Sequence, residues 1–189
     1  MTGRAIGAYA RENEMLDEAA ALTPPQVAEL LRSTATTISA ELRAVPAVLA
    51  GWHPAPGEWC MKEALGHIIE AERRGFAGRV RILLQHDQPD LATWDQVAIA
   101  QQRRDCQREV ADLLREFAEL RDASVTLVAS LSVADLERAG NHPQVGYLRV
   151  NDVMQEWVHH DRNHVRQMLA NVQSFVWPHM GSAQRFSDD

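Results

Sequence analysis

The stretch from residue 150 to residue 172, VNDVMQEWVHHDRNHVRQMLANV, says most about the fold of this chain. It contains neither proline nor glycine, and its apolar residues recur every three or four positions, which predicts one long amphipathic helix. At 3.6 residues per turn, one face of that helix carries Val153, Trp157, His160, His164 and Met168. Two histidines one turn apart therefore lie on the face that is expected to point at a protein core.

Three further segments with helical periodicity lie between the prolines of the chain, and proline is excluded from helix interiors. We predict helices over residues 23–45, with Thr23 as the N-cap, over 60–85 and over 105–130. A short extra helix is possible within 88–104, the tail after Pro178 is expected to be irregular, and no strand pattern is present. Four long helices around one core favour an all-α fold, an up-down four-helix bundle. We expect one domain over 1–189, with its core at about 23–172 and flanking segments at 1–22 and 173–189.

Length, charge and cysteine content exclude several classes of protein. The 189 residues are 46% hydrophobic, which is enough to bury a core without metal or disulfides. A net charge of −7 argues against a nucleic-acid binder. No apolar run approaches the roughly 20 residues of a membrane span, and the N-terminal residues do not resemble a signal peptide. Because the two cysteines, Cys60 and Cys106, do not make a disulfide scaffold, we expect a cytoplasmic protein.

The eight histidines of the chain are the candidates for a metal site. His160 and His164 have the HxxxH spacing with which two helical histidines chelate one metal ion. Two buried imidazoles without partners would cost roughly 1–3 kcal/mol each, which favours metal ligation over two satisfied core histidines or a polar patch. His159 points away from the same face. The other four, His53, His86, His142 and His179, are expected to be solvated side chains, although His53 and His142 could line a site mouth.

His67 is the candidate third ligand, on the helix predicted over 60–85. It lies in a stripe that otherwise consists of small residues, namely Cys60, Ala64, Ala71, Gly75 and Gly78. The stripe could be only a packing groove with one histidine at its edge, or it could bring His67 to His160 and His164. Three histidines leave a fourth position open, which is the arrangement of a catalytic metal site.

Two motifs together resemble the DinB/YfiT-like superfamily. The first is Pro56-x-x-Trp59-Cys-x-x-Glu63-x-x-x-His67, and the second is Trp157-x-x-His160-Asp161-x-x-His164-x-x-Gln167. The resemblance spans about residues 25–172 and lies in the order of the helices and in the spacing of the motifs. It implies a four-helix bundle that holds zinc or nickel by three histidines, to which His67, His160 and His164 correspond. It also implies a homodimer.

The same resemblance implies an activity only in outline. Some members of the superfamily use low-molecular-weight thiols as cosubstrates, and many have no assigned reaction. One departure from the family pattern is Cys60, which stands where a serine or threonine usually caps the helix. A cysteine at a helix N-terminus can be reactive, but ordinary packing is the expected role. Cys60 lies roughly 10 Å along the helix from His67, too far to share its metal.

Several side chains near the histidines are candidates for the pocket. Asp161 could orient a ligand imidazole, although a salt bridge with Arg162 or Arg166 is the favoured interpretation. Glu63 and Glu70 could act as a base, but exposed helix-surface glutamates are the default. Trp59 and Trp157 are expected in the core, where they could also wall a pocket.

Three functions from different classes follow from these residues. The first is a metal-dependent enzyme, a transferase or hydrolase, that activates a thiol or water against a small electrophile. The second is a non-catalytic, stress-related or regulatory metal-binding bundle, which nothing in the sequence excludes. The third, a di-iron carboxylate bundle, is rejected because its Glu-x-x-His motif occurs only once, at Glu156–His159, and points away from the core.

Overall fold

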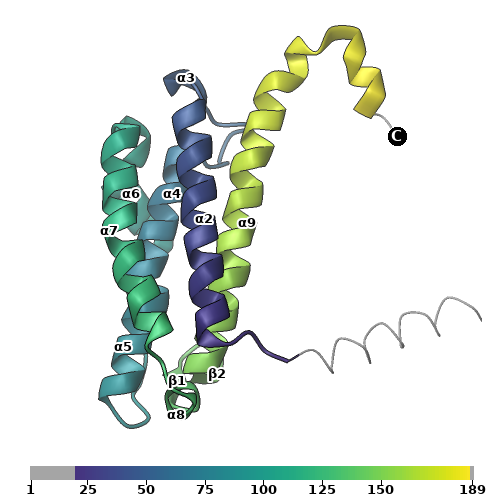
Figure 1. The fold of residues 1–189 in the computed structure, drawn as a ribbon. Helices are drawn as coiled ribbons and strands as arrows, with labels where there is room; N and C mark the ends of the chain where they lie inside the picture. Colours follow the sequence, from purple (N-terminus) through teal and green to yellow (C-terminus); the bar gives the residue numbers. More distant parts are fainter. Residues whose placement is uncertain (1–19, 188–189) are drawn as a thin grey trace, which may run out of the picture.

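A computed structural model describes residues 20–187, and four long helical segments dominate it (Figure 1). They are α2 (Pro24–Ala44), α4 (Met61–Glu70) continued through a π-helical turn η1 (Ala71–Phe76) into α5 (Ala77–Gln85), α7 (Val110–Ala129) and α9 (Val150–Val176). The all-α four-helix bundle predicted from the sequence is confirmed. Thr23 is the N-cap of α2, as expected. The third helix begins at Val110 instead of residue 105, after a separate 3-10 turn η2 (Asp105–Gln107).

The directions of the four helices refine the expected up-down order. Helix α2 runs antiparallel to α4–α5, and α7 runs antiparallel to α9, but α4–α5 and α7 run in the same direction (Figure 1). Two contacts agree with the parallel direction of α4–α5 and α7. Near the start of both helices, Lys62 Nζ donates to the Arg108 carbonyl, and further along both helices Arg121 forms an ion pair with Glu72. The crossover at 86–109, which contains the short helix α6 (Gln96–Arg103), returns the chain to the end where α4 began. The extra helix expected within 88–104 is therefore present.

The remaining elements are short, and two of them, a strand pair and a turn in the C-terminal tail, were not expected from the sequence. They comprise α3 (Ala47–Ala50), α8 (Val133–Leu136), the strands β1 (Ala139–His142) and β2 (Gly146–Arg149), and the 3-10 turns η3 (Trp177–His179) and η4 (Gly181–Ser187). The antiparallel hairpin β1–β2 was not expected, because its strands lack apolar alternation. It is held by the crossover instead: the Asn141 N–H donates to the Pro89 carbonyl at 2.9 Å. The tail after Pro178 is likewise more ordered than expected, with η4 in it.

The apolar core consists of two clusters, separated by a layer of buried charge. One cluster surrounds Phe76 and Trp157, and the other surrounds Leu65, Phe117 and Met168. Between them lie Glu72, Arg121 and Asp161, which we call the charged layer, with exposed fractions of 0%, 1% and 0%. Each of the three helices α4–α5, α7 and α9 contributes one member of this layer, which therefore crosses the bundle at mid-height.

The two cysteines also differ from the expectation. Cys60 is fully buried and forms a disulfide with Cys106, 46 residues away, because η2 returns beside the start of α4. Over residues 20–187 the structure contains no helix that is long and apolar enough to cross a membrane.

Candidate metal centre

Two helices bring three histidines to one point. His67 projects from α4, and His160 and His164 project from successive turns of α9. One ligand nitrogen from each of these residues, the histidine triad, lies within 4.8 Å of the other two. His67 Nε2 and His160 Nε2 are 3.0 Å apart, close to the roughly 3.4 Å that a tetrahedral ion with 2.0–2.1 Å bonds to nitrogen would impose. The three histidines singled out from the sequence therefore lie together in the fold, and His159 is exposed, as expected.

Burial keeps the triad in the form that a metal requires. Burial, together with the smaller effect of the neighbouring histidine rings, lowers the pKa of His67 to about 4 and that of His160 to about 3. The pKa of His164 is also lowered by burial. Neutral imidazoles carry a free lone pair at neutral pH, and metal binding needs that lone pair. Within the described residues, no further His, Cys, Asp or Glu joins the group, so a bound ion would keep open positions.

The local sequence explains why His67 faces α9. Helix α4 begins at a capping box in which the Cys60 N–H donates to Glu63 Oε2 at 3.1 Å. One turn beyond His67, the π-helical turn η1 inserts an extra residue, so Ala71 and Phe76 face the same cavity although they are five positions apart. Single π turns of this kind are frequent at functional sites. The sequence pattern predicted a continuous α-helix here and missed this turn.

Aromatic rings surround the triad. Trp59 packs against His67 with ring centroids 4.9 Å apart, and Trp94 stacks on His67 at 5.8 Å. Phe76 meets the edge of His160 at 5.0 Å. Trp59 is only half-buried and walls the pocket, which was the alternative to the expected core position, whereas Trp157 lies fully buried behind Phe76 in the core, as expected. The rings limit the access of water to the histidines and fix their orientation.

Hydrogen bonds determine which ring nitrogens can bind a metal. His164 Nδ1 donates to Gln167 Oε1 at 2.9 Å, which leaves the lone pair of Nε2 free. Gln167 was part of the second sequence motif. Asp161 does not orient a ligand imidazole, and it does not pair with Arg162 or Arg166. It is buried against Arg121, whose Nη1 donates to Asp161 Oδ2 at 2.6 Å. The predicted partners were wrong because Asp161 faces the core instead of solvent.

The charged layer directly underlies the triad. Arg121 Nε donates to Glu72 Oε2 at 3.0 Å, and Arg121 Nη1 also donates to the Leu31 carbonyl at 3.1 Å. Burial raises the pKa of Glu72, and the nearby Asp161 carboxylate raises it further, against the opposing effect of Arg121. The layer joins α2, α4–α5, α7 and α9, and its member Asp161 is the residue next to His160 in the sequence. Glu72 and Arg121 were not identified from the sequence as structural residues.

The two candidate glutamates have structural partners. Glu70 is 3% exposed, contrary to the expectation of an exposed side chain. Arg74 donates to Glu70 Oε2 at 2.7 Å and Arg103 donates to Oε1 at 2.8 Å. Burial would raise the pKa of Glu70, but these bonds and the adjacent Arg73 outweigh it, so the pKa is lowered. Glu63 accepts from His53 Nε2 at 2.9 Å in addition to capping α4. Neither carboxylate is free to act as a base.

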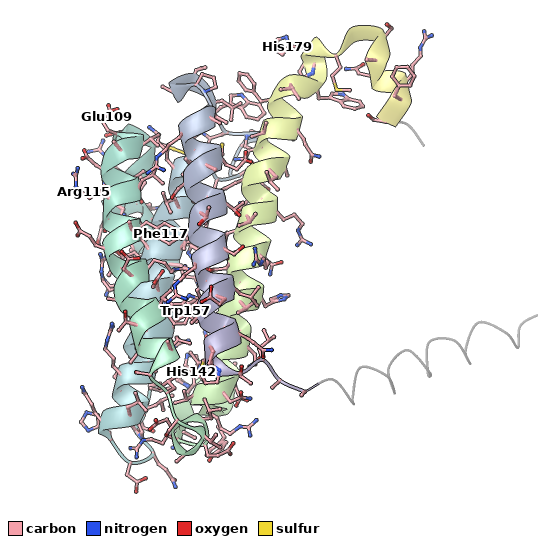
Figure 2. The ribbon with its side chains drawn as sticks, in the orientation of Figure 1. Glu109, Arg115, Phe117, His142, Trp157 and His179 are labelled. Carbon is pink, nitrogen blue, oxygen red and sulfur yellow. A yellow bond between two sulfur atoms is a disulfide. The ribbon has the colours of Figure 1, made fainter. Side chains whose placement is uncertain are left out.

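A cavity of about 400 Å³ opens from the triad along α5 and the β1–β2 hairpin. At its other end Arg79 donates to His142 Nε2 at 2.8 Å. His142 is 6% exposed, so it is not a solvated side chain, although it does line the site as one alternative allowed. Burial lowers its pKa, and the Arg79 guanidinium lowers it further. The hairpin that the sequence did not predict is therefore the element that places His142 in the cavity, near the lower end of the bundle in Figure 2.

Comparisons with known proteins agree with this architecture. A family model described as the DinB superfamily matches residues 29–168. The chain belongs to the DinB superfamily. Among solved structures, it is similar to YfiT from Bacillus subtilis, with a TM-score of 0.74 and 14% sequence identity over 82% of this chain and 88% of that chain. That protein is described as "a probable metal-dependent hydrolase with an unusual four-helix bundle topology". No curated protein sequence matches this DinB-superfamily chain significantly.

Proposed function

We propose that this DinB-superfamily protein is a metal-dependent enzyme that acts on a small molecule. The observation that carries the proposal is the histidine triad, three neutral imidazoles converging within 4.8 Å at the wall of a cavity of about 400 Å³. His67, His160 and His164 would hold one zinc or nickel ion, both of which suit imidazole ligands. When bound, such an ion lowers the pKa of a water or thiol in its open position and polarises an electrophile.

The residues of the chain around that position would select and shield the substrate. The rings of Trp59, Trp94 and Phe76 exclude water from the side of the histidines, which strengthens electrostatic interactions there. The Arg79 guanidinium lines the other end of the cavity and offers donors to a carboxylate or another anionic group. An electrophile or thiol with an anionic end would therefore lie between Arg79 and the triad.

The nucleophile is either water or a low-molecular-weight thiol, which would make the protein a hydrolase or an S-transferase. The description of YfiT as a probable hydrolase supports the first. The thiol use implied by the resemblance to the DinB/YfiT-like superfamily supports the second. The homodimer and the cytoplasmic location implied by the sequence analysis stay predictions.

The test is a panel of reactions with metal-free and reconstituted protein. Esters and amides are assayed for hydrolysis, and epoxides, halides and enoyl compounds are assayed with added small thiols. We expect turnover that chelation abolishes and zinc or nickel restores, retained in His159→Ala and lost in His160→Ala. No metal-dependent turnover across the panel would favour the non-catalytic metal-binding bundle.

Arg79→Leu tests the role of the far end of the cavity. For an anionic substrate we expect KM to rise at least about tenfold with a smaller change in kcat, because a charge-assisted contact contributes about 1.5–3 kcal/mol to binding. A neutral analogue of the same substrate serves as the control and should show no such change. Equal effects on both substrates would contradict anion binding by Arg79.

A further inference from the structure

A second group of metal-ligating side chains lies at the start of α4, apart from the triad. It consists of His53, Cys60, Glu63 and Cys106, which we call the cysteine cluster, and one ligand atom of each lies within 4.8 Å of the others. Three separate segments contribute: the loop after α3, the first turn of α4, and η2. Cys60 precedes His67 by seven residues, or about 10 Å along the helix, so the two groups could not share one ion.

The donor set of the cysteine cluster is that of a zinc site. Two thiolates, one imidazole and one carboxylate supply the four ligands of a tetrahedral ion. Such an ion, with bonds of about 2.0–2.3 Å, holds its ligand atoms roughly 3.3–3.8 Å apart. His53 Nε2 lies 2.9 Å from Glu63 Oε2 and 3.7 Å from Cys106 Sγ, so small side-chain shifts would place these atoms around one ion.

The backbone at the two cysteines suits both a disulfide and a shared ion. Their Cα atoms are 7.0 Å apart, at the outer edge of the separations that disulfides span. With the S–S bond broken, the same backbone leaves room for two sulfurs on either side of an ion. Cys60 is also the N-cap of α4, where the helix dipole favours the thiolate. The exposed His53 and the partly exposed Cys106 give an ion access from solvent, although Cys60 is buried.

We propose that the cysteine cluster, when Cys60 and Cys106 are reduced, binds one Zn²⁺, and that the disulfide and the zinc-bound dithiolate are alternative states of this site. This site is distinct from the histidine triad and does not depend on the proposed enzyme activity.

The exchange between the states balances as follows. A phosphine reductant breaks the S–S bond, gives up two electrons and takes the oxygen of water, so it becomes a phosphine oxide while both sulfurs become thiols. Zn²⁺ binding then displaces the two thiol protons to solvent. In the reverse direction a peroxide takes two electrons from the thiolates, the S–S bond forms, the O–O bond breaks to give two waters with two solvent protons, and Zn²⁺ is released.

Either the disulfide or the bound zinc ion would join the crossover to the start of α4, and both of these segments line the cavity. Cys106 lies in the crossover that also carries Trp94, whose ring stacks on His67, and Gln96, which lines the cavity. Cys60 begins the helix that carries His67. The reduced, metal-free protein has neither the disulfide nor the zinc ion. In that form we expect faster amide hydrogen exchange over residues 94–107 than in the disulfide or zinc form.

The full-length protein tests the proposal by metal loading. Protein reduced with a phosphine under anaerobic conditions is loaded with Zn²⁺, desalted and analysed for metal per chain. We expect two zinc ions per chain in the reduced wild type and one in the oxidised wild type. Each single variant, reduced His160→Ala or reduced Cys106→Ser, should bind one ion. The variant that combines His160→Ala with Cys106→Ser should bind none. Circular dichroism confirms that each variant is folded.

Loading with Co²⁺ identifies the ligands directly. We expect the thiolate-to-cobalt charge-transfer band in the reduced wild type and in reduced His160→Ala, and none in Cys106→Ser or in the oxidised protein. A folded, reduced His160→Ala variant that binds no zinc and shows no such band would overturn the proposal. If instead the triad were not a metal site, the reduced wild type and His160→Ala would both bind one ion with this band, so the two failures are distinguishable.

Discussion

Arg121→Leu tests the structural role of the charged layer beneath the histidine triad. Arg121 is 1% exposed and donates to Asp161, Glu72 and the Leu31 carbonyl. Its removal would leave two buried carboxylates without their cationic partner. Breaking a buried pair by removing one partner costs about 3–5 kcal/mol, because the remaining charge is left uncompensated. Since domains are stable by about 5–15 kcal/mol, we expect Arg121→Leu to lose roughly a fifth of the total free energy of unfolding or more.

The free energy of unfolding is measured by urea denaturation at pH 8, followed by circular dichroism. With about 2–4 °C of melting temperature per kcal/mol for a chain of this size, the variant should also melt roughly 6–20 °C below the wild type. Arg115→Ala is the matched control on the same helix (Figure 2), because Arg115 is exposed and pairs only with Asp112 at the surface. That variant should change the stability by less than about 0.5 kcal/mol.

The pH dependence of the stability lost in Arg121→Leu distinguishes an effect of charge from an effect of packing. Burial raises the pKa of Glu72, and Arg121→Leu removes the guanidinium that opposes this rise. The Glu72 carboxylate should therefore take up a proton more readily at pH 5 than at pH 8, so the difference in stability from the wild type should shrink at pH 5. A loss below about 1 kcal/mol at pH 8, or one that does not change with pH, would refute the assignment of a buried ionic layer.

Two further predictions concern packing beside the triad and its protonation. Gly66→Ala should destabilise the protein by about 1–3 kcal/mol in chemical denaturation, because a Cβ at residue 66 would collide with the Asp105 carboxylate. Gly75→Ala, in the same helical segment, is the control. Its Cβ would meet only an ordinary contact, so this substitution should be neutral or slightly stabilising. In the metal-free protein the free energy of unfolding should fall between pH 7 and pH 5 by about 2 kcal/mol for each of His67 and His160, because the unfolded chain takes up protons near pH 6.5 that the buried rings resist down to about 4 and 3. Equal pH slopes in the wild type and in a variant with both histidines replaced by glutamine would contradict this prediction.

The helices and the triad could be predicted because they depend on local periodicity. Proline positions and the spacing of apolar residues determine where α2 and α9 begin, and helix geometry places His160 and His164 on one face. The third candidate ligand, His67, needed the family resemblance as well, because its own stripe is also compatible with a simple packing groove.

The charged layer could have been recognised from the positions of its residues in the sequence, although composition alone does not reveal it. Arg121 lies four residues after Phe117 and three before Ser124, and Asp161 lies four after Trp157, so both occupy positions on buried faces. Glu72 likewise follows Ile68 by four. Each was treated as an ordinary surface charge or passed over, whereas together one cation and two anions on three apolar faces indicate a buried ion network.

The remaining differences come from contacts between distant segments. The β1–β2 hairpin is held by hydrogen bonds to Pro89 and Leu91 in the crossover, and the disulfide joins segments 46 residues apart. The parallel run of α4–α5 and α7 follows from the same crossover. Periodicity within a helix contains no information about such contacts, so they could not be predicted from it.

Metal content per chain tests the central claim most directly. The protein in its disulfide form is purified, dialysed with zinc, desalted and measured by elemental analysis, alongside His160→Ala and the exposed neighbour variant His159→Ala. We predict about one ion per chain in the wild type and in His159→Ala and none in His160→Ala. Equal metal content in the wild type and His160→Ala would contradict the assignment of the histidine triad as the metal centre.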